Sequence, residues 1–200
     1  SKLVLTNIKL NINRINMNKY QPAIKQGIIM GAVSILLFLV LYAVDPMFYA
    51  KPMGWVTVFV VNFLALPIVF MILGARNSKP NFTPFRFQEA FVSAFLTSVV
   101  ATVVLLCFNF IFISVIDTTW EKELGEEIIR STETFMEDMG APQEAIDEAM
   151  VKAKGDLENR ATGVMGQLKS ALGGLGWYLI LALIIGAVQK DKKTEEDLLV

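Results

Sequence analysis

The sequence contains no histidine and a single cysteine, Cys107, in 200 residues. One cysteine cannot form a disulfide within the chain, and a zinc site needs His or Cys ligands that this chain does not supply. No Gly-rich phosphate loop follows a strand, and no nucleophile has a base near it. We therefore predict no catalytic residue, no metal site and no cofactor, and we expect the protein not to be an enzyme.

Charge is almost missing from four long apolar blocks, although 18% of the chain is charged and 54% is hydrophobic. Residues 90–116 contain no charged residue at all. As a helix this block would be about 40 Å long, enough to cross a hydrocarbon core of roughly 30 Å. The pattern predicts an all-α membrane protein with four transmembrane helices, at residues 23–44, 53–73, 90–116 and 172–188.

These spans divide the rest of the chain into segments of different character. Residues 1–21 read as a flexible cytoplasmic lead, and the sequence after Met17 resembles an ordinary N-terminus, so we favour a natural start there. Residues 22–116 hold the first three spans, 117–170 a projecting antiparallel helical hairpin, 171–188 the fourth span and 189–200 a loose tail. Glycines 173, 174 and 176 mark the expected bend where the hairpin meets the fourth span.

Basic residues near the spans predict the direction of crossing. Arg76, Lys79 and Arg86 lie in the second loop, whereas Lys51 is the only basic residue of the first loop. Because cytoplasmic loops carry the excess of Lys and Arg, both termini are expected in the cytoplasm. In a bacterium the chain would then sit in the inner membrane, with the acidic hairpin in the periplasm.

The hairpin prediction rests on two apolar stripes at helical spacing. Thr118 and Glu121 fit a capping box, and Gly140 with Pro142 marks the turn. The hairpin carboxylates lack the spacing of a cation-binding loop, so a solvated face is the preferred interpretation. The expected hairpin core consists of Trp120, Leu124, Ile128, Phe135, Met150, Leu157 and Val164.

Small and polar residues within the spans predict helix packing. Gly27 and Gly31 have the spacing that lets two helix backbones approach closely, and Pro67 predicts a kink. Asn62 and Asn109 lie at similar depths on consecutive spans, so we predict that they bond each other, share a water or bond backbone carbonyls. Glu89 is read as an interfacial charge with a local partner rather than a gating carboxylate. The remaining packing candidates on the third span are Ala94, Ser98 and Thr102.

Four stretches resemble a known family: NKYQPAIKQGIIMG, FQEAF, NFIFISVID and MGAPQEAID. Over residues 17–193 the chain is similar to small bacterial inner-membrane proteins grouped as domain of unknown function 4199. The resemblance implies four spans and no established activity, and it defines no catalytic residue. Such proteins are similar in setting to neighbours of polyprenyl-phosphate glycosyltransferases, which suggests an envelope-assembly partner.

Three functions remain open on the sequence. The leading hypothesis is a non-enzymatic accessory or scaffold subunit that binds membrane lipids and a larger membrane protein or further copies of itself, with no nucleic acid. The alternative is a small lipid or solute carrier or channel, which would need a polar path through the spans. An intramembrane enzyme is disfavoured because the spans carry no His, Asp or Glu in their interiors.

Overall fold

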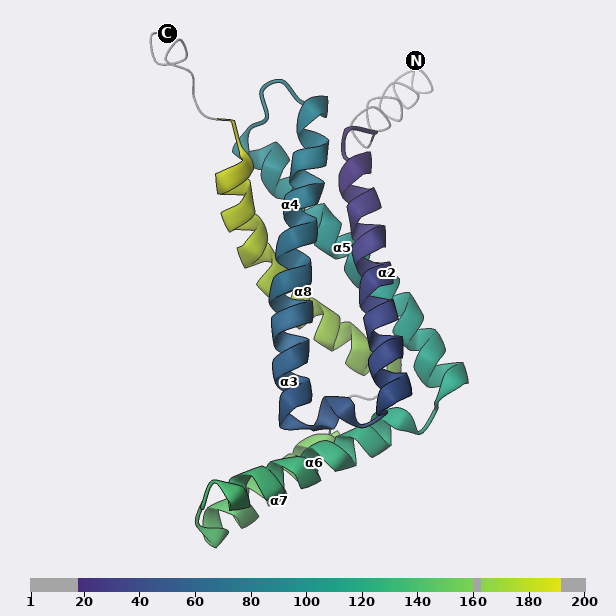
Figure 1. The fold of residues 1–200 in the computed structure, drawn as a ribbon, viewed down its shortest axis with the longest axis vertical. Coiled ribbons are helices and arrows are strands. Elements are labelled where there is room, and N and C mark those ends of the chain that lie inside the picture. The colour runs from purple at the N-terminus through teal and green to yellow at the C-terminus, as the bar shows by residue number, and fades with distance from the viewer. Residues whose placement is uncertain (1–17, 160–162, 192–200) are drawn as a thin grey trace, which may run out of the picture. The chain divides into compact units, whose positions relative to one another are not determined.

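The computed structural model describes residues 18–159 and 163–191, with side chains for 18–157 and 165–191, and every regular element within these ranges is helical (Figure 1). Four helices in this part of the chain are long and apolar enough to cross a membrane, which confirms the all-α membrane fold. They extend over Gln21–Val44, Pro52–Asn81, Phe87–Ile116 and Met165–Gln189. The start near Met17 and the lead before it lie outside the described residues.

The four spans are built from more than simple α-helices. The first is α2 (Gln21–Val44), and the second joins α3 (Pro52–Val58), the π-helical η2 (Phe59–Ala65), α4 (Leu66–Ser78) and the short η3 (Lys79–Asn81). The third joins α5 (Phe87–Ile111) to the π-helical η4 (Phe112–Ile116), and the fourth belongs to α8 (Gly163–Gln189). The π-helical η2 ends at Ala65, two residues before Pro67. A π-helical section bends a helix, and this one lies in the stretch where Pro67 predicts a kink.

The hairpin outside the spans consists of α6 (Trp120–Asp138) and α7 (Gln143–Asn159). Gly140 takes the left-handed conformation, φ 73°, at the turn between them. Its N–H donates to the Glu137 carbonyl at 2.8 Å and that of Ala141 to Met136 at 3.0 Å, which together form a Schellman motif. The turn therefore lies where the sequence predicts it.

The chain separates into two compact units, each described here by itself. The first unit holds residues 1–32, 66–104 and 174–200, and the second holds 33–65 and 105–173. The ends of the described chain and the loop after η3 belong to the first unit, whereas the first loop, with the short helix η1 (Phe48–Ala50), and the hairpin belong to the second.

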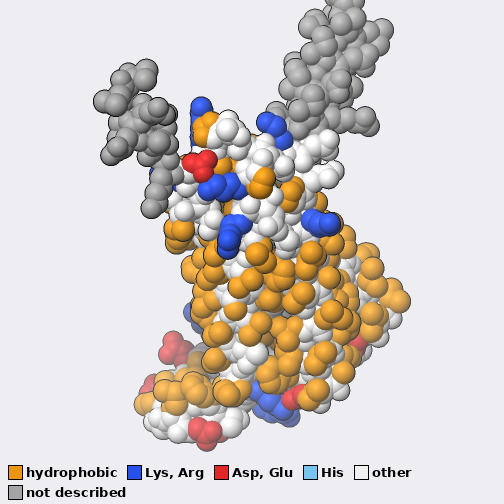
Figure 2. Space-filling model, turned by 45° about the horizontal axis from the view of Figure 1, so that its top comes forward, with side chains coloured by type: hydrophobic (Ala, Val, Ile, Leu, Met, Phe, Trp, Pro, Cys, Tyr) orange, Lys and Arg blue, Asp and Glu red, His pale blue; other side chains and the backbone are white. Residues whose placement is uncertain are grey.

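The first unit has a core in which small and medium side chains of α4, α5 and α8 pack together with the fully buried Phe85 of the loop before α5. Ala90 and Ala94 of α5 are fully buried against Met71 and Ala75 of α4 and Ala182 of α8. Figure 2 shows that hydrophobic side chains dominate the visible surface of the spans, while Lys and Arg gather where the helices of the first unit end. Large apolar side chains thus face outward and small ones inward, as expected of a helix bundle in lipid.

Three boundaries differ from the sequence-based prediction. The helix of the last span begins at Gly163, and it runs through the three glycines expected to bend it. The second hairpin helix, α7, is described to Asn159, and residues 163–170 of the predicted hairpin belong to the helix of the fourth span. The tail is not loose at Asp191, because the Asp191 N–H donates to the Phe85 carbonyl at 2.8 Å.

Candidate functional site

The centre of the first unit is a polar contact among α2, α4 and α5. The Thr97 hydroxyl of α5 is fully buried and lies 3.1 Å from the Ala23 carbonyl of α2 and 3.0 Å from the Ser93 carbonyl of its own helix. A Cβ at Gly74 of α4 would lie only 2.1 Å from the Thr97 hydroxyl oxygen. Gly74 of α4 therefore leaves room for the Thr97 hydroxyl, which joins α5 to α2.

The predicted packing residues of α2 lie against α5 in the first unit. A Cβ at Gly27 would be 2.5 Å from the Thr97 carbonyl oxygen, and one at Gly31 would be 2.8 Å from the Val104 Cβ. Both glycines are buried, and each faces atoms that cannot rotate away freely. The two helix backbones approach closely at the pair that the small-residue spacing singles out.

The other hydroxyls of α5 bond carbonyls of their own helix. Ser93 donates to Glu89 at 2.7 Å, Ser98 to Phe95 at 2.7 Å and Thr102 to Ser98 at 2.9 Å. Such local bonds occupy the hydroxyl protons that a carrier would otherwise donate to a solute. The hydroxyl groups of this span therefore form a packing seam.

The two asparagines behave differently from the hydroxyls. Asn62 lies in η2 and Asn109 in α5, and both side chains are half-buried. Within the described part of the chain neither amide makes a hydrogen bond. The predicted direct bond between them, and the alternative bond to a carbonyl, are therefore not formed, and a shared water stays a prediction.

The second unit is organised around aromatic rings from the ends of the spans and the start of α6. Phe38 of α2 lies edge-on to Phe112 at 5.0 Å and to Trp120 at 5.4 Å between ring centroids. Tyr49 of η1 stacks on Phe38 at 5.5 Å, and burial raises the pKa of its hydroxyl to about 12. Edge-to-face pairs of this kind contribute about 0.5–1.5 kcal/mol each beyond the area they bury.

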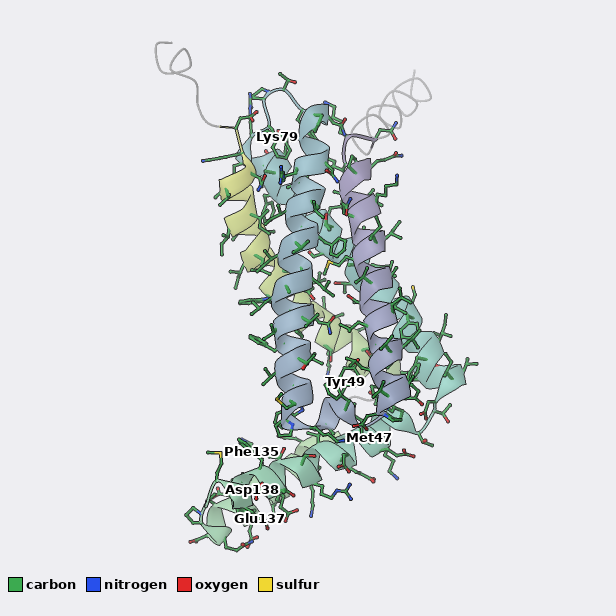
Figure 3. All side chains as sticks on the ribbon, in the orientation of Figure 1. Met47, Tyr49, Lys79, Phe135, Glu137 and Asp138 are labelled. Carbon is green, nitrogen blue, oxygen red and sulfur yellow. The ribbon has the colours of Figure 1, made fainter. Side chains whose placement is uncertain are left out.

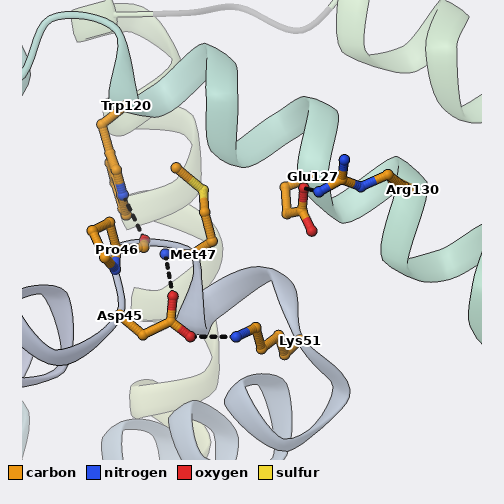
Figure 4. A network of polar contacts seen from close by, with 7 residues as sticks. All are labelled: Asp45, Pro46, Met47, Lys51, Trp120, Glu127 and Arg130. Carbon is orange, nitrogen blue, oxygen red and sulfur yellow. Dashed lines mark hydrogen bonds and ion pairs between the residues drawn. The ribbon is translucent and has the colours of Figure 1, made fainter.

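Polar bonds fix the start of α6 to this aromatic cluster. The Tyr42 hydroxyl donates to an Asp117 carboxylate oxygen at 2.7 Å, and the other oxygen accepts the Trp120 backbone N–H at 3.0 Å. The Trp120 indole N–H donates to the Pro46 carbonyl at 2.9 Å (Figure 4). Donation by the Tyr42 hydroxyl lowers the pKa of the Asp117 carboxyl below its usual value.

This arrangement corrects the predicted capping box. The helix begins at Trp120 with Thr119 as N-cap, and no N-cap side chain bonds the backbone. Asp117, outside the predicted pattern, supplies the acceptor instead and also takes the Thr119 N–H at 3.2 Å. The Asp117 carboxylate thus accepts the N–H groups of the N-cap and of the first helical residue, whereas an N-cap threonine would accept that of the second or third.

The hairpin core is smaller than predicted. Ile146 and Met150 of α7 are buried, and Leu157 packs on Gly125 of α6, where a Cβ would lie 2.6 Å from the leucine Cδ1. Trp120, Leu124, Ile128 and Leu157 are half-buried, and the Val164 side chain lies outside the described residues. Phe135 is 45% exposed, so its assignment to the core is wrong. Gly125 and Ile146 are buried in the hairpin, and the predicted core omitted both.

The outer surface of the hairpin is acidic. Between Asp117 and Leu157 the only basic residues are Lys122, Arg130, Lys152 and Lys154. Lys122 pairs with Glu126 at 3.8 Å, both exposed, and the exposed Arg130 pairs with the half-buried Glu127 of the same helix. Such surface pairs contribute little to stability, so the excess negative charge is left facing solvent.

The start of the C-terminal tail is bonded to the basic loop of the first unit. One Asp191 carboxylate oxygen accepts the Phe85 N–H at 2.8 Å, and the other pairs with the Lys79 ammonium at 2.8 Å. The hydrogen bond from the Lys79 ammonium, and then that from the Phe85 N–H, lower the pKa of the Asp191 carboxyl. We call this arrangement the tail clamp.

Two buried polar atoms and a groove are further candidates for chemistry. The Ser78 hydroxyl and one Glu89 carboxylate oxygen are buried without a hydrogen-bond partner in the described chain, so the expected local partner of Glu89 is not found there. A groove of about 220 Å³ in the second unit is lined by Leu106, Cys107, Phe110, Gln167 and Leu168. Within residues 18–159 and 163–191 no group of three His, Cys, Asp or Glu residues could hold a metal ion.

A comparison with family models gives one match, to "Protein of unknown function (DUF4199)", over residues 25–191. No curated protein and no solved structure matches the chain. The match covers all four spans and the hairpin between them.

Proposed function

The chain belongs to the DUF4199 family, whose function is unknown, and from that premise we propose that it is a non-enzymatic accessory subunit of a larger membrane complex. The observation that carries the proposal is the state of the polar groups in the third span. Ser93, Thr97, Ser98 and Thr102 all donate to backbone carbonyls. A span whose polar groups are used in packing offers them neither to a solute nor to a reacting substrate.

The same bonds count against the carrier alternative. A polar path would need hydroxyls or amides free to replace the water around a solute. A few polar side chains of the spans, Asn62, Asn109 and Ser78 among them, make no hydrogen bond in the described part of the chain, and so few groups do not make up a path across a bilayer. A scaffold needs no such path.

The surface suited to a partner is the acidic outer face of the hairpin. It is mounted on the aromatic cluster through Trp120 and Asp117, so its position in the second unit is fixed by several bonds. A rigid charged surface steers a partner of opposite charge and sets its orientation. The partner we expect is therefore a membrane protein with a basic segment on the hairpin side, and a polyprenyl-phosphate glycosyltransferase is the candidate that the family resemblance suggests.

We also propose a bacterial inner-membrane topology with both termini in the cytoplasm and the hairpin in the periplasm. Arg76, Lys79, Arg86 and Lys190 belong to the unit that holds both ends of the described chain. The test uses a Cys107→Ser background with a single cysteine at Lys79 or Glu137. A membrane-impermeant thiol reagent applied to intact cells should label the Glu137→Cys chain alone, and the reverse pattern would invert the topology.

Copurification after gentle detergent extraction tests the subunit proposal. A stoichiometric membrane partner should be recovered with the unmodified chain and lost with Leu157→Asp, which places a charge against Gly125 in the hairpin core. Val151→Asp is the matched control, because Val151 lies on the same helix and is already 74% exposed. Recovery of a monomer that conducts solute flux in liposomes would refute the proposal in favour of a carrier.

A further inference from the structure

One apolar stripe on α6 continues beyond the part that the protein itself covers. Trp120, Leu124 and Ile128 follow one another at intervals of four, and Phe135 and Met139 extend the same face. Residues at this spacing share one side of a helix. We call these five residues the α6 stripe.

The first member of the stripe is packed against the ends of the spans. The Trp120 ring lies edge-on to Phe112 at 5.5 Å and to Tyr49 at 6.2 Å, and its N–H bonds Pro46 in the first loop. Phe112 belongs to η4 and Pro46 follows the end of α2, so the stripe starts where two spans of the second unit end. The face of α6 that carries the stripe therefore faces the span ends.

Exposure along the stripe increases with distance from this contact. Leu124 and Ile128 are half-buried, whereas Phe135 is 45% and Met139 is 69% exposed. The partner helix α7 packs on α6 at Gly125, and the hairpin leaves Phe135 and Met139 exposed to this extent. Gly125 is one residue from Leu124, which places the two side-chain directions about 100° apart around the helix.

Most of the charge lies on the opposite side of the helix, although Glu121, Glu127 and Asp138 lie at the edges of the stripe. Glu137 follows Phe135 by two residues and so points about 160° away from it. Figure 3 draws Phe135 on the side of α6 toward α3 and Glu137 on the side away from α3. In Figure 1, α6 runs across the direction of α3 within the second unit rather than continuing along it.

We propose that the α6 stripe is a membrane-contact surface, with Phe135 and Met139 inserted into the boundary between headgroups and acyl chains on the hairpin side of the bilayer. A helix with one apolar face containing aromatic residues and one charged face lies in the plane of a membrane interface. Continuity with the Trp120 contact at the span ends sets the level and the direction of the stripe. The hairpin then lies along the lipid surface instead of projecting 30–40 Å from it, as its helix lengths alone would suggest.

The acidic residues of α6 define the lipid that suits this surface. Glu123, Glu126, Glu133 and Glu137 give the helix a strong negative charge outside the stripe, each at least about 120° from Phe135 around the helix. Anionic headgroups would repel these carboxylates, so the binding energy must come from the apolar residues. The occupant is therefore a zwitterionic lipid surface, and a protein partner or a second copy of the chain is an alternative that the experiment distinguishes.

The experiment places a polarity-sensitive fluorophore on single cysteines in the full-length Cys107→Ser chain, reconstituted in phosphatidylcholine nanodiscs. Labels at Phe135→Cys and Met139→Cys report on the stripe, and a label at Glu137→Cys reports on the opposite face. Val151→Cys is the matched control, an apolar residue of α7 that is 74% exposed and lies off the stripe. Each label is quenched in turn by nitroxide lipids and by aqueous iodide.

Strong quenching by nitroxide lipid at positions 135 and 139, with preferential quenching by iodide at 137 and 151, is the expected result. Adding Phe135→Asp to the Met139→Cys chain should abolish the lipid quenching at 139. Equal iodide quenching at 135 and 151 would overturn the proposal, because the stripe would then face water. Protection of position 135 from both quenchers would also overturn it, since protein would then cover the stripe. The measurement does not involve a protein partner, so its result is independent of the proposed subunit role.

Discussion

Replacing Gly27 by Ala is expected to destabilise the chain, although alanine is the better helix former. The added Cβ would lie 2.5 Å from the Thr97 carbonyl oxygen and 2.7 Å from the Val100 Cβ. Ordinary contact begins at 3.4 Å, so α2 and α5 must separate by most of an ångström. The first obstacle is backbone, which cannot rotate away as a side chain could.

The size of the effect follows from two opposing terms. Overpacking a close contact costs about 1–3 kcal/mol, because a gap of 0.5–1 Å elsewhere forfeits a quarter to a half of each dispersion contact. Removing a glycine from a helix interior returns about 0.5–1 kcal/mol. The net loss should be about 0.5–2 kcal/mol.

Gly176→Ala is the matched control on α8, since nothing lies within 4 Å of a Cβ at that position. It should leave stability unchanged or raise it by up to about 1 kcal/mol. The assay is reversible unfolding of the purified chain in mixed micelles of increasing dodecyl sulfate content, followed by helical circular dichroism. If the Gly27→Ala and Gly176→Ala chains unfold at the same midpoint, the close approach of α2 and α5 does not exist.

Three further substitutions test other contacts. Thr97→Val keeps the side-chain shape and removes the bond to Ala23, so the same unfolding assay should show a loss of about 0.6 kcal/mol, the average for a hydrogen bond between membrane helices; no loss would mean that the hydroxyl does not join α2 to α5. Trp120→Phe keeps a ring in the aromatic cluster but removes the N–H that donates to Pro46 at 2.9 Å, and amide exchange at the start of α6 should quicken while that of α5 does not. Asp191→Asn should lower the exchange protection of the Phe85 amide by weakening the tail clamp. In the unmodified chain the lowered pKa of Asp191 means that the clamp is complete above the usual carboxyl value of about 3.9 and is lost as the pH falls through the lower folded value. Equal protection in the Asp191→Asn chain, or no loss on acidification, would refute the clamp.

The spans could be predicted from the sequence because their signal is collective. Residues 90–116 contain no charged residue, so their burial in lipid or protein can be concluded without knowing the contacts of any single side chain. Gly27 and Gly31 were recognisable for a related reason, since small residues four apart are the usual means of close helix approach. Which helix they meet was not predictable, because the spacing describes one surface and not its partner.

The hairpin contacts show where pattern reasoning fails. An apolar stripe identifies the side of α6 that avoids water, and Phe135 was assigned to the hairpin core on that ground. The contact with α7 instead uses Gly125, which has no side chain and no hydrophobic signal, because it admits Leu157 closely. The capping residue was missed in the same way, since Thr118 fits a familiar spacing while Asp117 acts only because Tyr42 orients its carboxylate.

The wrong assignment of Phe135 has a physical origin that bears on what α6 does. A helix in water needs one apolar face for one partner, but α6 has two contact directions, a small one toward α7 at Gly125 and a larger one along the stripe from Trp120 to Met139. Burial by α7 cannot account for the larger face, because Phe135 and Met139 remain 45% and 69% exposed. A second apolar environment must therefore contact it, and the packing of Trp120 against the span ends places that environment on the membrane side of the helix.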